Sequence, residues 1–138
     1  MSTAYIGAEL RRLVAARADY RCEYCRIHEE DAFFSYHIDH IISEKHGGPT
    51  QAGNLAYACT FCNLRKGSDI ASVAVGGALT RLFHPRIDQW SHHFGLQGPT
   101  IETLTPIGEA TARLLAFNAV DRLLERRLLQ ASGRYPVA

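Results

Sequence analysis

The pattern of apolar and polar positions predicts a helix, a strand and a second helix in the first half of the chain. Apolar residues at helical spacing and frequent alanine favour a helix over residues 4–18. Residues 33–42 are rich in aromatic and β-branched types, which predicts a strand. Alternate residues of a strand face opposite sides, so His40 is expected on one face and Asp39 on the other. Turn residues follow, and a short helix is expected over residues 60–68.

The second half of the chain shows a clear helical pattern only near its end. Residues 79–83 are a candidate strand, and residues 87–105 a candidate short helix with one or two strands. Thr105 followed by Pro106 is a typical helix start, because threonine caps the first turn and proline suits its first position. Asn118 can divide the following region into two helices. The apolar residues of that region follow a helical stripe: Leu114, Phe117, Val120, Leu124 and Leu128.

Composition and charge narrow the class of protein. A chain of 138 residues with 46% hydrophobic content suits one domain with its own core. The net charge of +1 is low for a nucleic-acid-binding domain, but residues 60–86 and 113–134 carry an excess of basic residues. A basic face is therefore compatible with a nearly neutral total. The chain starts without signal-peptide features and has no long apolar run, so we expect a cytoplasmic protein without membrane partners.

All four cysteines fall into two CxxC pairs, Cys22/Cys25 and Cys59/Cys62. In a reducing compartment, paired CxxC motifs indicate a metal site rather than disulfides. Two such turns can present four sulfurs in a tetrahedron, which predicts a closed, structural zinc site. A redox-active CxxC is the alternative, and the lack of a thioredoxin-like βαβ pattern argues against it.

Five short motifs lie between and beside the cysteine pairs. They are DHI (39–41), HGG (46–48), NL (54–55), CxxCN (59–63) and KG (66–67), in this order. Together they resemble the HNH endonuclease family. In that family a ββα-metal hairpin and helix hold one catalytic divalent cation.

The resemblance also implies a fold class. It implies an α+β protein whose ββα-metal core, at about residues 20–70, is stabilised by the four-cysteine zinc site. The predicted N-terminal helix and a mostly helical C-terminal extension over residues 71–138 would flank this core. We expect residues 1–138 to form a single HNH nuclease domain.

The resemblance assigns roles to four polar residues. His40 matches the general base, a role that suits an imidazole because it exchanges a proton near neutral pH. Asp39 and Asn63 match the positions that hold the catalytic cation. A carboxylate and an amide oxygen favour Mg²⁺ or Mn²⁺ there rather than zinc. Asn54 matches the central asparagine, which fixes the loop that orients the histidine.

Three further residues are candidates for substrate contact. Lys66 could meet a phosphate, although a lysine before glycine is also ordinary chemistry at the end of a helix. His46 lies at a position where the family often has a basic residue, although loop histidines are usually just exposed. His37 is expected on the same strand face as Asp39.

The sequence therefore favours a metal-dependent DNA endonuclease, an enzyme that hydrolyses phosphodiester bonds with a histidine base and one divalent cation. The expected substrate is duplex DNA, because a ββα hairpin and helix can approach a groove. The alternative is a non-catalytic zinc module that binds DNA or a protein, but zinc binding does not require Asp39, His40 or Asn63. A homodimer or a partner protein would compensate for the low net charge in DNA binding.

The remaining polar residues are interpreted as structural. Residues 82–94, LFHPRIDQWSHHF, resemble a segment of some bacterial HNH proteins without assigned chemistry. We expect its aromatic residues to pack and its polar groups to bond to one another. The arginines near the end are expected on a solvated helix face: Arg122, Arg126, Arg127 and Arg134.

Overall fold

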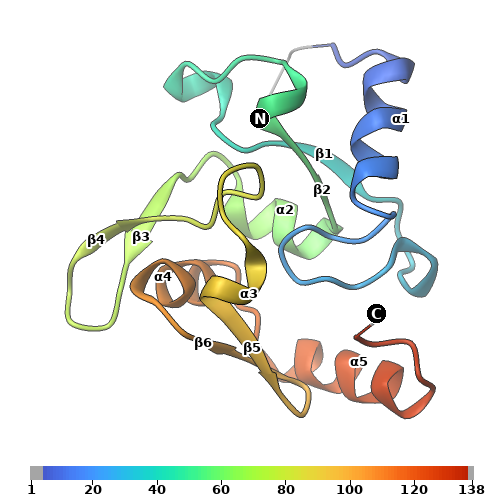
Figure 1. The fold of residues 1–138 in the computed structure, drawn as a ribbon, viewed down its shortest axis with the longest axis vertical. Coiled ribbons are helices and arrows are strands. Elements are labelled where there is room, and N and C mark those ends of the chain that lie inside the picture. The colour runs from blue at the N-terminus through green and yellow to red at the C-terminus, as the bar shows by residue number, and fades with distance from the viewer. Residues whose placement is uncertain (1–4, 137–138) are drawn as a thin grey trace. The chain divides into compact units, whose positions relative to one another are not determined.

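The structure is a computed structural model that describes residues 5–136, arranged in two compact units (Figure 1). The first unit runs to Ile70 and also includes the short segment His84–Ile87. The second contains Ala71–Phe83 and the chain from Asp88 onward. The single domain over residues 1–138 stays a prediction. Position 4, where the first helix was expected to begin, lies outside the described residues.

The first unit contains a ββα arrangement that follows a helix. Helix α1 covers Ala8–Arg17, strands β1 and β2 cover His37–His40 and Leu55–Ala58, and helix α2 covers Thr60–Lys66. The two strands form an antiparallel hairpin (Figure 1). The chain between these elements includes three short 3₁₀ helices, η1, η2 and η3, at Glu29–Asp31, Glu44–His46 and Ala52–Asn54.

Strand β1 is shorter than the strand predicted over residues 33–42. Phe33 and Phe34 are 102% and 63% exposed, so they do not contribute to a buried face. The backbone N–H of Tyr36 donates to the Glu29 carboxylate at 2.8 Å instead of to a neighbouring strand. Aromatic content alone therefore overestimated the strand, because these aromatic residues lie in a loop.

The second unit consists of two hairpins and three helices. Strands β3 (Ala71–Val73) and β4 (Leu79–Arg81) pair antiparallel, as do β5 (Phe94–Gln97) and β6 (Thr100–Thr103). Helix α3 (Trp90–His93) precedes β5, and helices α4 and α5 follow β6 at Pro106–Leu114 and Val120–Ala131. The break between α4 and α5 was expected near Asn118. Among the described residues, no helix is both long and apolar enough to cross a membrane.

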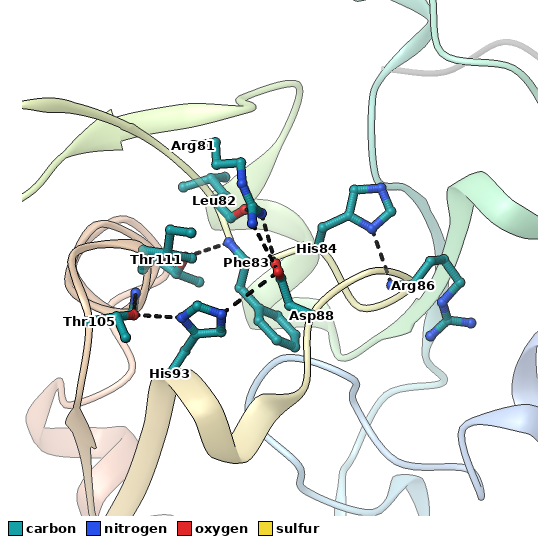
Figure 2. Close-up of polar contacts among 11 residues, drawn as sticks. Arg81, Leu82, Phe83, His84, Arg86, Asp88, His93, Thr105 and Thr111 are labelled. Carbon is teal, nitrogen blue, oxygen red and sulfur yellow. Dashed lines mark hydrogen bonds and ion pairs between the residues drawn. The ribbon is translucent and has the colours of Figure 1, made fainter.

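The residues of the segment 82–94 that belong to the second unit pack and form polar contacts within that unit. The rings of Phe83 and Phe94 lie 5.6 Å apart between centroids. Asp88 accepts two bonds from Arg81, at 2.7 and 2.9 Å (Figure 2). His93 lies between Asp88 and Thr105, with Nε2 at 3.7 Å from the carboxylate and Nδ1 at 2.5 Å from the hydroxyl (Figure 2). The side chains of Arg81, Asp88, His93 and Thr105 therefore form one connected set of polar contacts within this unit.

Thr105 caps helix α4, as its position before Pro106 predicted. Its hydroxyl accepts a hydrogen bond from the Gly108 N–H at 3.1 Å. Gly108 also lies close to the end of α3, because an added Cβ would come within 2.3 Å of the His93 carbonyl oxygen. The cap and this close approach fix the start of α4 next to α3.

Helix α5 presents the reverse of the expected faces. Arg122 and Arg126 are 4% and 0% exposed, whereas Val120, Leu124 and Leu128 are 84%, 53% and 63% exposed. The expectation of a fully solvated arginine face was therefore wrong for these two arginines.

Backbone and amide oxygens beside α5 require donors that leucine cannot supply. Arg126 donates through Nε to the Pro99 carbonyl at 2.7 Å and through Nη2 to the Asn118 side chain at 2.9 Å. Asn118 in turn bonds to both backbone groups of Ile101, at 2.9 and 2.8 Å. Arginine therefore occupies the inner face because it satisfies these acceptors.

Candidate functional site

The four cysteines converge in the first unit. Cys22, Cys25, Cys59 and Cys62 are all buried, and their sulfur atoms lie within 4.8 Å of one another. The N–H groups of Cys25 and Cys62 point at the first sulfur of each pair, at 3.4 and 3.3 Å. Because the Cys59 sulfur also caps α2, the second pair joins β2 directly to that helix.

This cluster fits a tetrahedral zinc ion. In a tetrahedron with Zn–S bonds of about 2.3 Å, the sulfurs lie about 3.8 Å apart. The sulfurs of Cys25 and Cys59 are 3.8 Å apart. Burial raises the pKa of the Cys22 thiol well above its usual range, so a cation is needed to hold the group as a thiolate. The four buried cysteines therefore form a site that can bind zinc.

Glu23, which lies between Cys22 and Cys25, connects the first cysteine turn to β2. The side chain of Glu23 accepts a hydrogen bond from the backbone N–H of Tyr57 at 2.8 Å. The backbone N–H of Glu23 donates to the Tyr57 carbonyl, also at 2.8 Å. Arg86, which belongs to the same unit, forms an ion pair with the Glu23 carboxylate. The first cysteine turn is thereby attached to β2.

Asp39 lies on β1 and is 4% exposed. Its Oδ2 accepts a hydrogen bond from the Tyr24 hydroxyl at 2.7 Å, and its Oδ1 lies 3.2 Å from the Lys66 ammonium. Burial raises the pKa of Asp39, while Lys66 and the Tyr24 hydroxyl act in the opposite direction. Each carboxylate oxygen has a second lone pair, so these contacts leave Asp39 able to bind a cation.

His40 is the last residue of β1 and is 5% exposed. Its ring nitrogen Nε2 lies 2.9 Å from the Thr50 hydroxyl. Its backbone carbonyl accepts a hydrogen bond from the Lys66 ammonium at 3.0 Å. Both the ring and the backbone of His40 are therefore held by neighbours, and the second ring nitrogen, Nδ1, has no role in these contacts.

Asn54 fixes the loop that follows His40. Its Oδ1 accepts from the Ile42 N–H at 2.9 Å, and its Nδ2 donates to the carbonyl oxygens of Ile42 and Pro49, both at 2.8 Å. Gly48 fits closely against this arrangement, because a Cβ there would lie 1.7 Å from the Ile42 carbonyl oxygen. The loop between the two strands thus depends on one asparagine and one glycine.

Asp39, His40 and Asn63 line one cleft of about 570 Å³ in the first unit. Asn63 belongs to α2 and directly follows the buried Cys62, so the cysteine cluster determines its position. It is half-buried, which leaves its amide within reach of the cleft. A carboxylate and an amide oxygen on one cleft are donors of the kind that Mg²⁺ and Mn²⁺ prefer. These residues therefore fit a divalent cation.

The three candidate substrate residues lie in different surroundings. His37 is exposed, lines the cleft, and has its Nε2 3.3 Å from the Thr60 hydroxyl. His46 is exposed at the end of η2 and is not among the cleft-lining residues. Lys66 is 1% exposed, and both of its hydrogen bonds stay inside the protein. This position gives no support to contact between Lys66 and a substrate.

Two residues that contact the site, Tyr24 and Thr50, were not identified from the sequence. Tyr24 reaches Asp39 from between two of the cysteines, and its position inside a CxxC turn could have indicated a buried side chain. Thr50 contacts the His40 ring from the loop, where a threonine has no distinguishing pattern.

Comparison with known proteins gives one family. Residues 22–69 match the family model described as HNH endonuclease. The matched region contains the four cysteines and also Asp39, His40 and Asn63, which line the cleft. No curated protein and no solved structure matches the chain.

Proposed function

We propose that the protein is a metal-dependent DNA endonuclease that hydrolyses phosphodiester bonds, because residues 22–69 match the HNH endonuclease family model. One observation carries the proposal. Asp39, His40 and Asn63, which have no role in zinc binding, line the same cleft. A module that only bound zinc and a partner would have no need for this combination.

In this proposal, His40 is the general base. The Thr50 hydroxyl holds Nε2 at 2.9 Å, so Nδ1 is the atom that takes the proton from the attacking water. Asn54 supports His40 indirectly, because its bonds to Ile42 and Pro49 shape the loop that carries Thr50. We therefore assign Thr50 and Asn54 as positioning residues.

Asp39 and Asn63 would hold one divalent cation, Mg²⁺ or Mn²⁺, whose charge would polarise the scissile phosphate and neutralise the leaving oxygen. Tyr24 and Lys66 orient the Asp39 carboxylate from behind. The cysteine cluster would hold zinc, and it sets the position of Asn63 through Cys62. The proposed substrate is duplex DNA, approached by the hairpin and α2.

Nicking of supercoiled plasmid tests the proposal. The wild-type protein is incubated with Mg²⁺ or Mn²⁺ and compared with His40→Ala and Asn63→Ala. Loss of a general base costs roughly 10²- to 10⁴-fold in rate, so we expect His40→Ala to fall by at least the lower value. His92→Ala is the matched control, because His92 is an exposed histidine of the second unit.

The outcome separates an enzyme from a binding module. Zinc content and thermal unfolding of each variant establish that it is folded. If the folded wild type is inert with every divalent ion tried, or if His40→Ala retains full activity, the proposal is wrong. Binding of duplex DNA without cleavage would favour the non-catalytic zinc module.

A further inference from the structure

The cleft that contains Asp39, His40 and Asn63 is also lined by two basic residues with no assigned role. Arg11 comes from α1, and Lys45 comes from η2 in the loop between the strands. Both are exposed. Arg11 lies outside residues 22–69, so the match to the family model carries no information about it.

No ion pair with any of residues 5–136 uses the charge of Arg11 or Lys45. Arg11 donates through Nε to the Ile6 carbonyl at 3.0 Å, which steadies the guanidinium and leaves its two terminal NH₂ groups available. The side chain of Lys45 makes no hydrogen bond or ion pair with any of residues 5–136. Lys66 differs, because its ammonium is committed to Asp39 and the His40 carbonyl.

A phosphodiester strand needs cations beyond the scissile phosphate. Every nucleotide adds a negative charge, and affinity for DNA depends largely on Lys and Arg contacts to these phosphates. The chain has a net charge of only +1, so a few well-placed cations must supply this part of binding. Arg11 and Lys45 are the exposed Arg and Lys residues that line the cleft.

We infer that Arg11 and Lys45 bind the backbone phosphates that flank the scissile bond. This inference rests on the proposed function, because it requires a nucleic-acid strand in the cleft. It adds a substrate-binding role for α1, which lies outside the region matched by the family model. Because phosphate contacts carry no sequence information, these residues affect binding to all duplexes about equally.

Salt-dependent DNA binding tests the inference. Affinity for a short labelled duplex is measured by fluorescence anisotropy at several salt concentrations, in the His40→Ala background so that no cleavage occurs. Each lost phosphate contact reduces the slope of log K against log salt by about 1. We expect Arg11→Ala and Lys45→Ala each to show this change, with affinity about tenfold lower at low salt, and the double variant to lose about 2 from the slope.

Arg12→Ala and Arg65→Ala are the matched controls. Arg12 is the neighbour of Arg11 on α1, Arg65 is the neighbour of Lys66 on α2, and both are exposed without lining the cleft. We expect each control to stay within about twofold of the parent, with an unchanged slope. Zinc content and thermal unfolding establish that each variant is folded.

Failure of this inference differs from failure of the proposed function. If the wild type cleaves DNA while Arg11→Ala and Lys45→Ala bind like the two controls, the inference is overturned and the nuclease proposal stands. If all four variants weaken binding equally, the effect is one of net charge and the inference is again overturned. If the wild type neither binds nor cleaves duplex DNA, both proposals fail.

Discussion

Lys66 and Asp39 form an ion pair inside the ββα arrangement, with 3.2 Å between Nζ and Oδ1 and exposed fractions of 1% and 4%. The same ammonium donates to the carbonyl of His40. One lysine at the end of α2 therefore contacts two adjacent residues of the proposed catalytic group on β1. Its role is to position them, and replacing it should affect both stability and the geometry of the cleft.

We expect Lys66→Met to lower the free energy of unfolding by about 3 kcal/mol or more. Removing one partner of a buried ion pair leaves an uncompensated charge, which typically costs about 3–5 kcal/mol. Urea unfolding with excess zinc measures the change. Arg65→Met is the control, since Arg65 is exposed on the same helix, and it should stay within about 0.5 kcal/mol of the wild type.

The double variant Asp39→Asn/Lys66→Met completes this experiment. With both charges removed, part of the stability lost in Lys66→Met should return, which gives a coupling energy between the two positions. Additive effects of the two single variants would show that the pair contributes nothing as a pair.

The inward position of Lys66 could not be predicted from the sequence. A lysine before glycine at the end of a helix is most often solvated, because burying an ammonium is costly unless it is paired. Its partner, Asp39, is 27 positions away in the chain, and only the folded hairpin brings them together. The cysteine cluster was predictable, because a CxxC turn fixes the relation of its two sulfurs locally.

The Gly48 position provides a second prediction. A Cβ at Gly48 would lie 1.7 Å from the Ile42 carbonyl oxygen and 2.8 Å from Asn54 Nδ2, so Gly48→Ala must displace the loop. We expect plasmid nicking to fall at least tenfold while zinc stays bound. Gly53→Ala is the control in the same loop, because its Cβ would meet nothing within 4 Å. Equal activity of the two variants would show that the loop geometry is unimportant.

Removal of zinc provides a third prediction. The cysteine cluster joins the first cysteine turn to β2 and α2, so the first unit should lose its structure when the metal is withdrawn. Structural zinc contributes on the order of 10 kcal/mol in zinc-finger peptides. We expect the purified protein to contain one zinc per chain. A strong chelator should remove this zinc, and the helical circular dichroism signal should fall as the metal is lost.

Return of the metal is the control for this experiment. Zinc, but not magnesium, should restore the signal, and Cys25→Ser should fail to retain zinc. A chain that keeps its full signal after complete removal of zinc would contradict a structural role for the cluster.

The faces of α5 show why the spacing of apolar residues did not predict the buried side of this helix. Apolar spacing correctly identified a helix but not which side is buried, because two inner acceptors, the Pro99 carbonyl and the Asn118 amide oxygen, come from other parts of the unit. An apolar stripe indicates the buried face only when the opposing surface is also apolar. Here the opposing surface presents oxygens, and an arginine satisfies them.

This reversal leads to a fourth prediction, which contrasts Arg126→Met with Leu124→Gln. Arg126 is 0% exposed, and methionine would leave the Pro99 carbonyl and the Asn118 amide oxygen without this donor. The Asn118 oxygen keeps the Ile101 N–H as a donor, so the Pro99 carbonyl is the group left unsatisfied. An unsatisfied buried group costs about 1–3 kcal/mol, so we expect Arg126→Met to lower the free energy of unfolding by about that amount. Leu124 is 53% exposed, and Leu124→Gln should change it by less than about 0.5 kcal/mol. Thermal and urea unfolding measure both variants. A larger loss from Leu124→Gln than from Arg126→Met would mean that the apolar stripe, and not the arginine face, packs against the rest of the unit.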